Sequence, residues 1–271
     1  MRNFHVSAGG INVERSKIDS VSGNVDISNC HDKYEVLYVI EGKGKCIIEG
    51  VEYPIKPRSV FVFPPLAYRS TLLESDFSYD RVSFCFEERH ISPAVSDTLI
   101  KFGVGDDRIS PAAFYGADAV CDQIASLVER FESAEAFPEE EKTKFLGLLL
   151  SELILLVSMA VKENRGYDES ELGARVIRYL NENVERDISL DKLAKRFFVS
   201  KYYLCRAFKK HNGISVHGYI NRKRVMYAKQ LIEAGETASR AAYRVGFGDY
   251  SAFYRAYVKL VGKAPTANEK S

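Results

Sequence analysis

The stretch ISLDKLAKRFFVSKYYLCRAFKK, residues 188–210, decides how this chain folds. Its first half follows Ser189, a residue type that caps helix N-termini, and repeats apolar residues at helical spacing. These residues are Leu190, Leu193, Ala194 and Phe197. Ser200 then caps a second helix, which is expected to bury Leu204 and Phe208. Two short helices with a tight turn between them predict a helix-turn-helix, whose second helix fits the major groove of DNA.

The solvent face of that second helix is polar and basic, as a DNA-contacting surface requires. Arg206 is expected to read base edges, because a planar guanidinium can donate two hydrogen bonds to guanine. Ser200 and the lysines are expected to hold the phosphate backbone, and Tyr202 is expected to touch bases or the sugar-phosphate. The full set of predicted DNA contacts in this unit is Ser200, Lys201, Tyr202, Tyr203, Cys205, Arg206, Lys209 and Lys210.

The same layout returns nearer the C-terminus. Thr237 caps a helix that ends at Gly246, where a left-handed conformation is expected. Asp249 caps the next helix, which is expected to bury Phe253 and Tyr257. One helix pair with a basic face is common, whereas two in tandem are a specific signal. The predicted DNA contacts of this second unit are Asp249, Tyr250, Ser251, Ala252 and Arg255.

The two units resemble the DNA-binding domain of the AraC/XylS family of bacterial transcription regulators. The resemblance is carried by SLDKLAKRFFVSKYYLCRAFKKHNGIS (189–215) and AAYRVGFGDYSAFYRAYVKLVGKAP (241–265). The chain departs from the family at Tyr257, where Phe is usual, and short Ala252 favours contact with a thymine methyl group. The resemblance implies a regulator of transcription that binds double-stranded DNA. Activation through contact with RNA polymerase is the expected action, and repression stays open.

The distribution of charge supports this assignment. The whole chain has a net charge of +1, which is uninformative. Residues 172–271 hold 20 Lys and Arg against 8 Asp and Glu, a net +12, and residues 1–171 carry −11. A basic domain is what phosphate binding through counterion release needs. Residues 222–224, Arg-Lys-Arg, are expected to face outward and either hold phosphates or form a solvated charged surface.

Residues 23–88 alternate short runs of β-forming residues with Gly and Pro turns, which predicts a sandwich or barrel. The stretch HDKYEVLYVIEGKGKCIIEGVEYPIKPRSVFVFPP, residues 31–65, resembles the cupin-like sensor domain that precedes such DNA-binding domains. This resemblance implies an N-terminal cupin-like β-barrel that binds a small-molecule effector. Residues 1–20 lack a strong period and are expected to form an arm over the ligand or the other domain.

The predicted effector contacts combine tyrosines, which offer stacking faces, with groups that can bind hydroxyls or carboxylates. A sugar or related carbohydrate metabolite is therefore the favoured effector. Only His31 and Glu35 remain of the ligand set of metal-binding cupins, so no metal or other cofactor is expected. Glu35 has a plainer alternative, a carboxylate paired with an arginine, and His31 can be a strand-end residue. The predicted effector contacts are His31, Glu35, Tyr68, Arg69, Tyr79 and Arg81.

Residues 117–162 show two apolar stripes of helical period, broken at 136–139. In the family this helical pair carries the homodimer interface, and burial within its own domain is the alternative. The polar stretch 164–171 is the predicted linker. We therefore predict an α+β chain with an N-terminal cupin-like β-barrel and helical dimerisation segment (1–163). An all-α domain with two helix-turn-helix motifs (172–271) follows the linker.

Several classes of protein are disfavoured. No uninterrupted transmembrane stretch or N-terminal apolar signal core is present, so a cytoplasmic protein with no membrane contact is expected. The five cysteines are scattered, which is typical of reduced thiols. We expect a regulator and not an enzyme. Two alternatives stay open, a cupin enzyme with a DNA-binding tail and a regulator whose barrel binds no small molecule.

Overall fold

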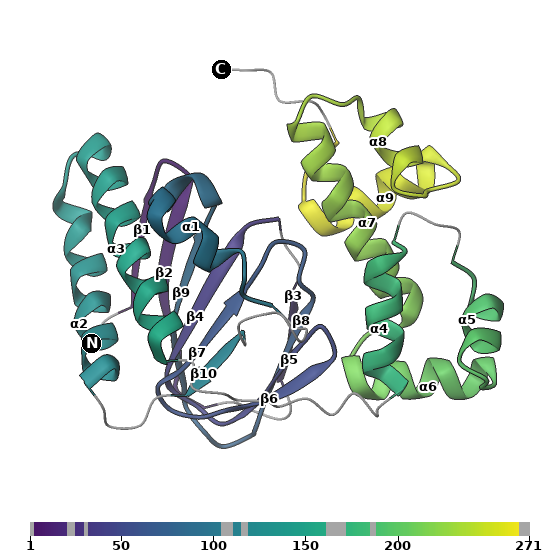
Figure 1. Cartoon of the computed structure of the whole chain (residues 1–271), viewed down its shortest axis with the longest axis horizontal. Coiled ribbons are helices and arrows are strands. Elements are labelled where there is room, and N and C mark those ends of the chain that lie inside the picture. Colours follow the sequence, from purple (N-terminus) through teal and green to yellow (C-terminus); the bar gives the residue numbers. More distant parts are fainter. Residues whose placement is uncertain are drawn as a thin grey trace.

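The computed structural model describes residues 3–20, 25–29, 32–103, 111–114, 119–160, 172–184 and 188–265. It has a strand-rich N-terminal part, here the strand domain (3–160), and an all-helical part, the helical domain (172–265) (Figure 1). The fold class is α+β, as predicted. Across Figure 1 the layers run from outer helices through two sheets to the helical domain. The linker predicted at 164–171 lies outside the described residues.

The first sheet has six strands in the order β1–β2–β9–β4–β7–β10, and neighbouring strands are antiparallel. Two of its interior strands, β4 and β7, are buried at almost every position. This burial follows from cover on both faces, by helices on one side and by the second sheet on the other. The strands are β1 (Phe4–Ala8), β2 (Ile11–Ile18), β4 (Tyr34–Glu41), β7 (Ser59–Phe63), β9 (Tyr79–Phe86) and β10 (Ala112–Phe114).

The second sheet has the order β3–β8–β5–β6, with strands β3 (Val25–Asn29), β5 (Gly44–Ile48), β6 (Val51–Ile55) and β8 (Arg69–Leu73). The two sheets enclose an inner core, here the inter-sheet core, that consists of Leu37, Val39, Cys46, Ile48, Val51, Tyr53, Ile55, Phe61, Phe63, Leu73 and Tyr79. Among the described residues no strand pairs across the two sheets. The strand domain is therefore an open sandwich and not the closed barrel that we predicted.

The N-terminal residues are not the arm that we expected. They form the hairpin β1–β2, and β2 pairs with β9 from Asn12–Cys85 to Ile18–Tyr79. The alternation of buried and exposed residues was obscured in the sequence by Arg15, a charged residue at an inward position. Arg15 is buried because its guanidinium pairs with Asp80 at 2.6 Å. The hairpin extends one edge of the first sheet beyond β9.

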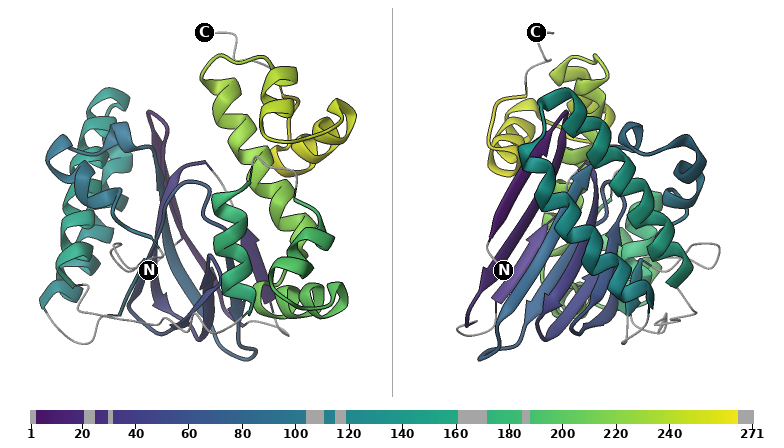
Figure 2. Two further views of the ribbon diagram at one scale, coloured as in Figure 1. Left: turned by 45° about the vertical axis from the view of Figure 1, so that its right-hand side comes forward. Right: turned by 90° about the vertical axis from the view of Figure 1, so that its left-hand side faces the viewer.

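Helices cover the outer face of the first sheet, as Figure 2 shows. The predicted pair at 117–162 is present, with a break at 134–138. Leu148, which we expected to be buried, is 66% exposed and lies on one stripe with exposed Leu155 and Met159. The elements are η1 (Glu88–His90), α1 (Pro93–Leu99), α2 (Ala119–Ser133), η2 (Ala134–Ala136) and α3 (Glu139–Ala160).

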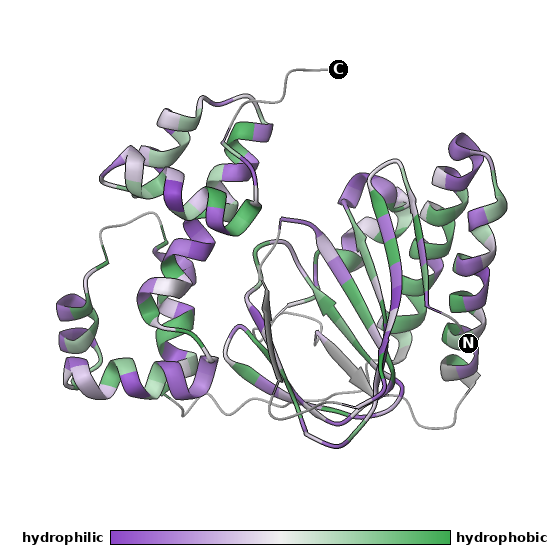
Figure 3. Cartoon of the chain, turned by 180° about the vertical axis from the view of Figure 1, so that it is seen from behind, coloured by the Kyte–Doolittle hydropathy of each residue, from purple (hydrophilic) through white to green (hydrophobic). Residues whose placement is uncertain are grey.

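The helical domain packs around a second core centred on the long helix α7, and hydrophobic (green) and hydrophilic (purple) residues alternate along its helices in Figure 3. Two residues of the strand domain, Leu66 and Tyr68, belong to this core. No helix in the described part of the chain is long and apolar enough to cross a membrane. The helices are α4 (Leu172–Glu182), α5 (Leu190–Arg196), α6 (Lys201–Asn212), α7 (Val216–Glu233), α8 (Ala238–Arg244) and α9 (Tyr250–Val261).

Candidate nucleic-acid interface

The first unit, residues 189–213, is the helix pair α5–α6. Ser189 Oγ accepts a hydrogen bond from the backbone N–H of Lys192, and Ser200 Oγ accepts one from that of Tyr203 at 3.1 Å. Both serines are therefore the N-caps that the sequence predicted. Helix α6 ends at Gly213, whose φ of 71° lies in the left-handed region.

The second unit, residues 237–262, repeats this construction in α8–α9. Thr237 caps α8, and Asp249 caps α9 by accepting from the N–H groups of Ser251 at 3.1 Å and Ala252 at 2.8 Å. Helix α9 ends at a left-handed Gly262. Helices α5 and α8 each have 7 residues, and α6 and α9 each have 12. The predicted internal repeat is confirmed at the level of helix lengths and caps.

The turns of the two units also match. The N–H of Val199 donates to the carbonyl of Ala194 at 3.0 Å, and Phe247 donates to Ala242 at the same distance. In the second unit Gly246 has a φ of 92°, which confirms the predicted left-handed position. The equivalent residue of the first unit is Phe198, with a φ of 55° and an exposed fraction of 94%. Our sequence analysis did not single out this phenylalanine.

Each second helix buries its predicted apolar residues and exposes its predicted polar side. In α6, Leu204 and Phe208 are fully buried, while Tyr202 is 75% exposed. In α9, Tyr250 is half-buried because its ring packs on Phe253, at 5.7 Å between centroids. Ala252 and Cys205 are also half-buried. The exposed predicted contacts are Ser200, Lys201, Tyr202, Tyr203, Arg206, Lys209, Lys210, Asp249, Ser251 and Arg255.

The expectation that residues 222–224 of α7 face outward was wrong. Arg222 lies over the ring of Tyr68 from the strand domain, and Arg224 donates to the carbonyls of Val184 and Gly246. Lys223 points at the strand domain with a side chain only 12% exposed. These three residues turn inward because their partners lie there. Local periodicity could not predict this, because the partners come from distant positions in the sequence.

The partner of Lys223 is Glu49, at the tip of the β5–β6 hairpin. Glu49 Oε1 accepts from Lys223 Nζ at 2.8 Å, and Oε2 accepts from the hydroxyl of Tyr219 at 2.7 Å. The side-chain amide of Asn181 on α4 donates to the same carboxylate. Burial alone would raise the pKa of Glu49, but Lys223 and the two hydrogen bonds hold it below its ordinary value. We call this group of four residues the Glu49 cluster.

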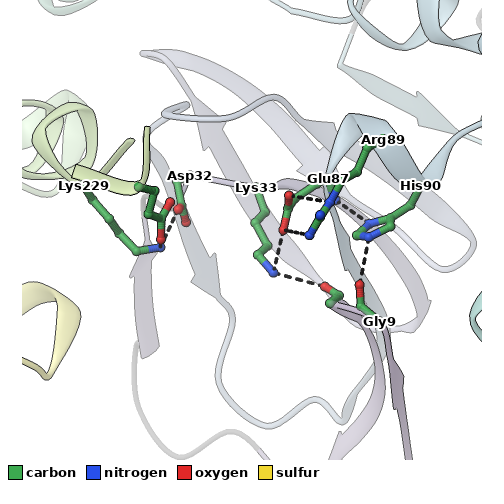
Figure 4. A network of polar contacts seen from close by, with 9 residues as sticks. Gly9, Asp32, Lys33, Glu87, Arg89, His90 and Lys229 are labelled. Carbon is green, nitrogen blue, oxygen red and sulfur yellow. Dashed lines mark hydrogen bonds and ion pairs between the residues drawn. The ribbon is translucent and has the colours of Figure 1, made fainter. Parts of the chain in front are cut away.

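A second contact joins the domains near the other end of α7. Lys229 Nζ pairs with Asp32, which follows β3 in the strand domain (Figure 4). Burial opposes both charges, yet the pairing lowers the pKa of Asp32 and raises that of Lys229. The neighbouring Lys33 contacts Glu87 and donates to the carbonyl of Gly10, within the strand domain. Helix α7 is thus held by the strand domain at two points.

The predicted effector residues do not form one pocket. Glu35 and Arg69 pair at 2.6 Å inside the sandwich, with side chains 3% and 10% exposed. Arg69 Nη1 is buried without a hydrogen-bond partner among the described residues. Tyr79 is buried in the inter-sheet core, with Arg81 over its ring. The ring of Tyr68 instead contacts Tyr219 of α7, 5.5 Å between centroids. His31 lies outside the described residues.

A cavity of about 550 Å³ opens at one end of the sandwich. Its walls come from the segments where the chain crosses between the two sheets, at 41–45, 54–57 and 74–78. Lys43 Nζ lies 5.0 Å from the centroid of the Phe77 ring and 2.9 Å from Glu74. None of the predicted effector residues in the described part of the chain lines this cavity. In the whole described part of the chain, no cluster of three or more His, Cys, Asp or Glu side chains could hold a metal ion.

Two family models match the chain. A helix-turn-helix domain model covers residues 193–270, and an AraC-like ligand binding domain model covers residues 26–67. The first of these ranges includes α6 and α9, the second helices of the two units, and α7. The second covers the part of the strand domain that runs from β3 to the turn after β7, and it includes Asp32, Glu35 and Glu49.

Curated relatives match over most of their length. The chain is 28% identical over 228 residues to the uncharacterised HTH-type transcriptional regulator YbfI of Bacillus subtilis, covering 82% of this chain and 78% of that protein. It is 28% identical over 233 residues to the HTH-type transcriptional activator RhaS of Escherichia coli O139:H28, covering 82% and 80%. The solved structure of ToxT from Vibrio cholerae O395 aligns over 95% of this chain and 96% of that one. That alignment has 15% identity and a TM-score of 0.40, too low to argue from.

Proposed function

This chain belongs to the AraC/XylS family of transcriptional regulators, and from that premise we propose that it is an effector-responsive activator that binds specific sites in double-stranded DNA. The family models and the curated relatives are those of transcription regulators. The chain is therefore not an enzyme, and the alternative of a cupin enzyme with a DNA-binding tail falls away.

The internal repeat of the helical domain carries this proposal. Two 12-residue helices, each capped at its start and ended by a left-handed glycine, present exposed basic faces. Both pack on the same core around α7, so they form one unit that can span two adjacent segments of the major groove. A single helix pair would support no more than one contact region.

We assign roles to the exposed residues of α6 and α9 accordingly. Arg206 and Arg255 read base edges, and Tyr202 and Tyr250 contact bases or the sugar-phosphate. Hydroxyl and ammonium groups at the start and end of α6 hold phosphates. The supporting observation is that most of these residues are exposed, while Tyr250, Cys205 and Ala252 are half-buried. The remaining assigned contacts are Ser200, Lys201, Tyr203, Cys205, Lys209, Lys210, Asp249, Ser251 and Ala252.

We further propose that the chain is a homodimer through its helices in 117–162. Leu148, Leu155 and Met159 are exposed along one stripe of α3, which is the arrangement that a partner helix would cover. Sedimentation equilibrium of the full chain checks this proposal. A Leu148→Glu and Leu155→Glu variant is expected to shift the dimer to a monomer, and a dimer of unchanged affinity would contradict it.

The proposed effector is a carbohydrate or related metabolite, bound in an effector-binding and dimerisation domain that we place at residues 1–163. The cavity beside Phe77 offers an aromatic face and the charged groups of Lys43 and Glu74. Activation is supported by the similarity to RhaS, a transcriptional activator, and we expect it to act through contact with RNA polymerase. The helical domain, taken as 172–271 after a linker at 164–171, would then respond through its contacts with the strand domain.

A second candidate is a regulator that binds no small molecule. The filled inter-sheet core favours it, because side chains occupy the space where a ligand of a barrel would lie. Thermal unfolding in the presence of neutral sugars, sugar acids and sugar phosphates separates the two candidates. A rise in the transition temperature with one class supports an effector, and no rise with any of them favours the second candidate.

Titration of the full chain with labelled DNA tests the proposed function. Duplexes selected from a random library by the protein itself are used in fluorescence anisotropy, at about 0.05 M and about 0.2 M salt. Binding that survives an excess of unlabelled random duplex is expected. If the random duplex displaces all of the labelled duplex, both with and without the metabolites above, the proposed function is overturned.

A further inference from the structure

Phe198 occupies a position that its counterpart fills with glycine. The turn hydrogen bonds Val199–Ala194 and Phe247–Ala242 superimpose the two units and place Phe198 opposite Gly246. Both residues have positive φ, at 55° and 92°. A left-handed conformation is strained for an aromatic residue and free of strain for glycine. The first unit therefore keeps an unfavourable residue where its twin has the favourable one.

Burial of the side chain does not offset this strain. Phe198 is 94% exposed, the largest exposed fraction among the large hydrophobic residues of the described part of the chain. The residue before it, Phe197, takes the packing role instead, since its ring meets Tyr179 of α4 at 6.1 Å. A strained, fully exposed aromatic residue has no structural use within the chain, and such outliers are typical of contact sites.

The surroundings of Phe198 identify its partner. Ser200 caps α6 directly after the turn, and the next exposed aromatic residues are Tyr202 and Tyr203, at 75% and 57%. Lys195, Arg196 and Lys201 flank the turn, and all three are exposed. An apolar ring set among cations fits a polyanion that also exposes apolar groups. Duplex DNA does so, through deoxyribose and the methyl groups of thymine.

We propose that Phe198 is a further DNA-contacting residue, which packs against deoxyribose and a base edge at the border of the groove entered by α6. Phe198 thereby adds affinity and sequence preference to the first unit. The second unit lacks this contribution, because Gly246 has no side chain. This inference rests on the proposed DNA-binding function. It extends the reading surface from the helix into the turn that precedes it.

The test compares the full chain with Phe198→Gly and Phe198→Ala, each titrated against the duplex selected by the wild-type protein. Phe198→Gly removes the strain, so a melting temperature at or above that of the wild type is expected. Affinity is expected to fall about tenfold in both variants, about 1.4 kcal/mol. The dependence of affinity on salt should stay unchanged, because no charge is lost.

Each result has one meaning. Weaker binding by a Phe198→Gly protein of undiminished stability supports the proposal, because misfolding cannot explain it. Wild-type affinity in that variant overturns the proposal, and a contact with another protein then becomes the explanation for the exposed ring. Failure of the wild-type chain to select any duplex would instead overturn the proposed function, so the two failures are distinguishable. Arg206→Ala serves as the positive control for lost binding.

Discussion

The two helix-turn-helix units share helix lengths, caps and turns, but they differ in charge. The first unit, residues 189–213, holds seven Lys and Arg against one Asp, and the second, residues 237–262, holds four against one. Each phosphate neutralised by a cation adds to affinity in a salt-dependent way. The first unit is therefore suited to hold the duplex. The second carries fewer cations, so we expect it to contribute less of the salt-dependent affinity.

The units also differ in how they are attached to the strand domain. The first is tied through His211 at the end of α6, which contacts the carbonyl of Gly50, and the part of α7 that follows it is tied through the Glu49 cluster. The part of α7 that leads into the second unit is tied through Lys229 and Asp32. The same sequence motif therefore occurs twice with different attachments to the strand domain, and tertiary contacts make the difference.

Breaking the Glu49 cluster should have the largest effect. Glu49→Ala leaves Lys223 nearly buried without its counter-charge, a change that typically costs about 3–5 kcal/mol. We expect the domains to unfold in two separate transitions in scanning calorimetry. Asp32→Ala removes a single ion pair and should have a smaller effect. A single, unshifted transition for Glu49→Ala would contradict this view of the attachment.

Acid should loosen the same contacts. The pKa of Glu49 is held below its ordinary value of 4.5, so its contribution to stability is present above that pH. The contribution is lost as the pH falls through the pKa of the folded state, and Asp32 behaves alike. Thermal unfolding of the full chain from neutral pH to about pH 3 measures the loss. Glu49→Gln should flatten this dependence, and an unchanged slope would show that other carboxylates cause it.

Replacing one arginine in each unit compares how the two units bind DNA, and these changes should have the next largest effect. Arg206→Ala and Arg255→Ala are each expected to weaken binding to the selected duplex by about 1–3 kcal/mol. Anisotropy titrations against selected and random duplexes measure both changes. If either variant loses the same amount on random DNA, that arginine contacts phosphate and does not read bases.

The helix caps should give the smallest effect. Asp249→Ala removes an acceptor of two backbone N–H groups, and Ser200→Ala removes an acceptor of one. We expect a loss of about 1 kcal/mol for the serine and somewhat more for the aspartate, whose charge also favours a helix N-terminus. Urea unfolding of the full chain measures both. Equal losses would indicate that the second hydrogen bond of Asp249 adds nothing.

Much of the helical domain could be predicted because its signals are local. The caps Ser189, Ser200, Thr237 and Asp249 and the left-handed Gly246 lie within a few residues of the groups they serve. Leu190 is an exception, since it is 36% exposed although it falls on the apolar face. Phe198 could have been found by aligning the two units and asking what replaces Gly246.

The strand domain and the contacts between domains were harder to predict. Arg15 hid the period of β2, since its partner Asp80 lies far along the chain. Nothing local marks Glu49 as a nearly buried group, because Asn181, Tyr219 and Lys223 reach it from the other domain. The Glu35–Arg69 pair matches the plainer alternative considered for Glu35. Such long-range pairs decide burial, and periodicity does not report them.

Helix α7 also limits how the target site of this protein can evolve. Its 18 residues correspond to a rigid rod of about 27 Å between the two units. An insertion of one residue within it would advance the second unit by about 1.5 Å and rotate it by about 100°. Single insertions would therefore point α9 away from the duplex. We therefore expect the distance between the two recognition elements of the operator to be more constant than their base sequences.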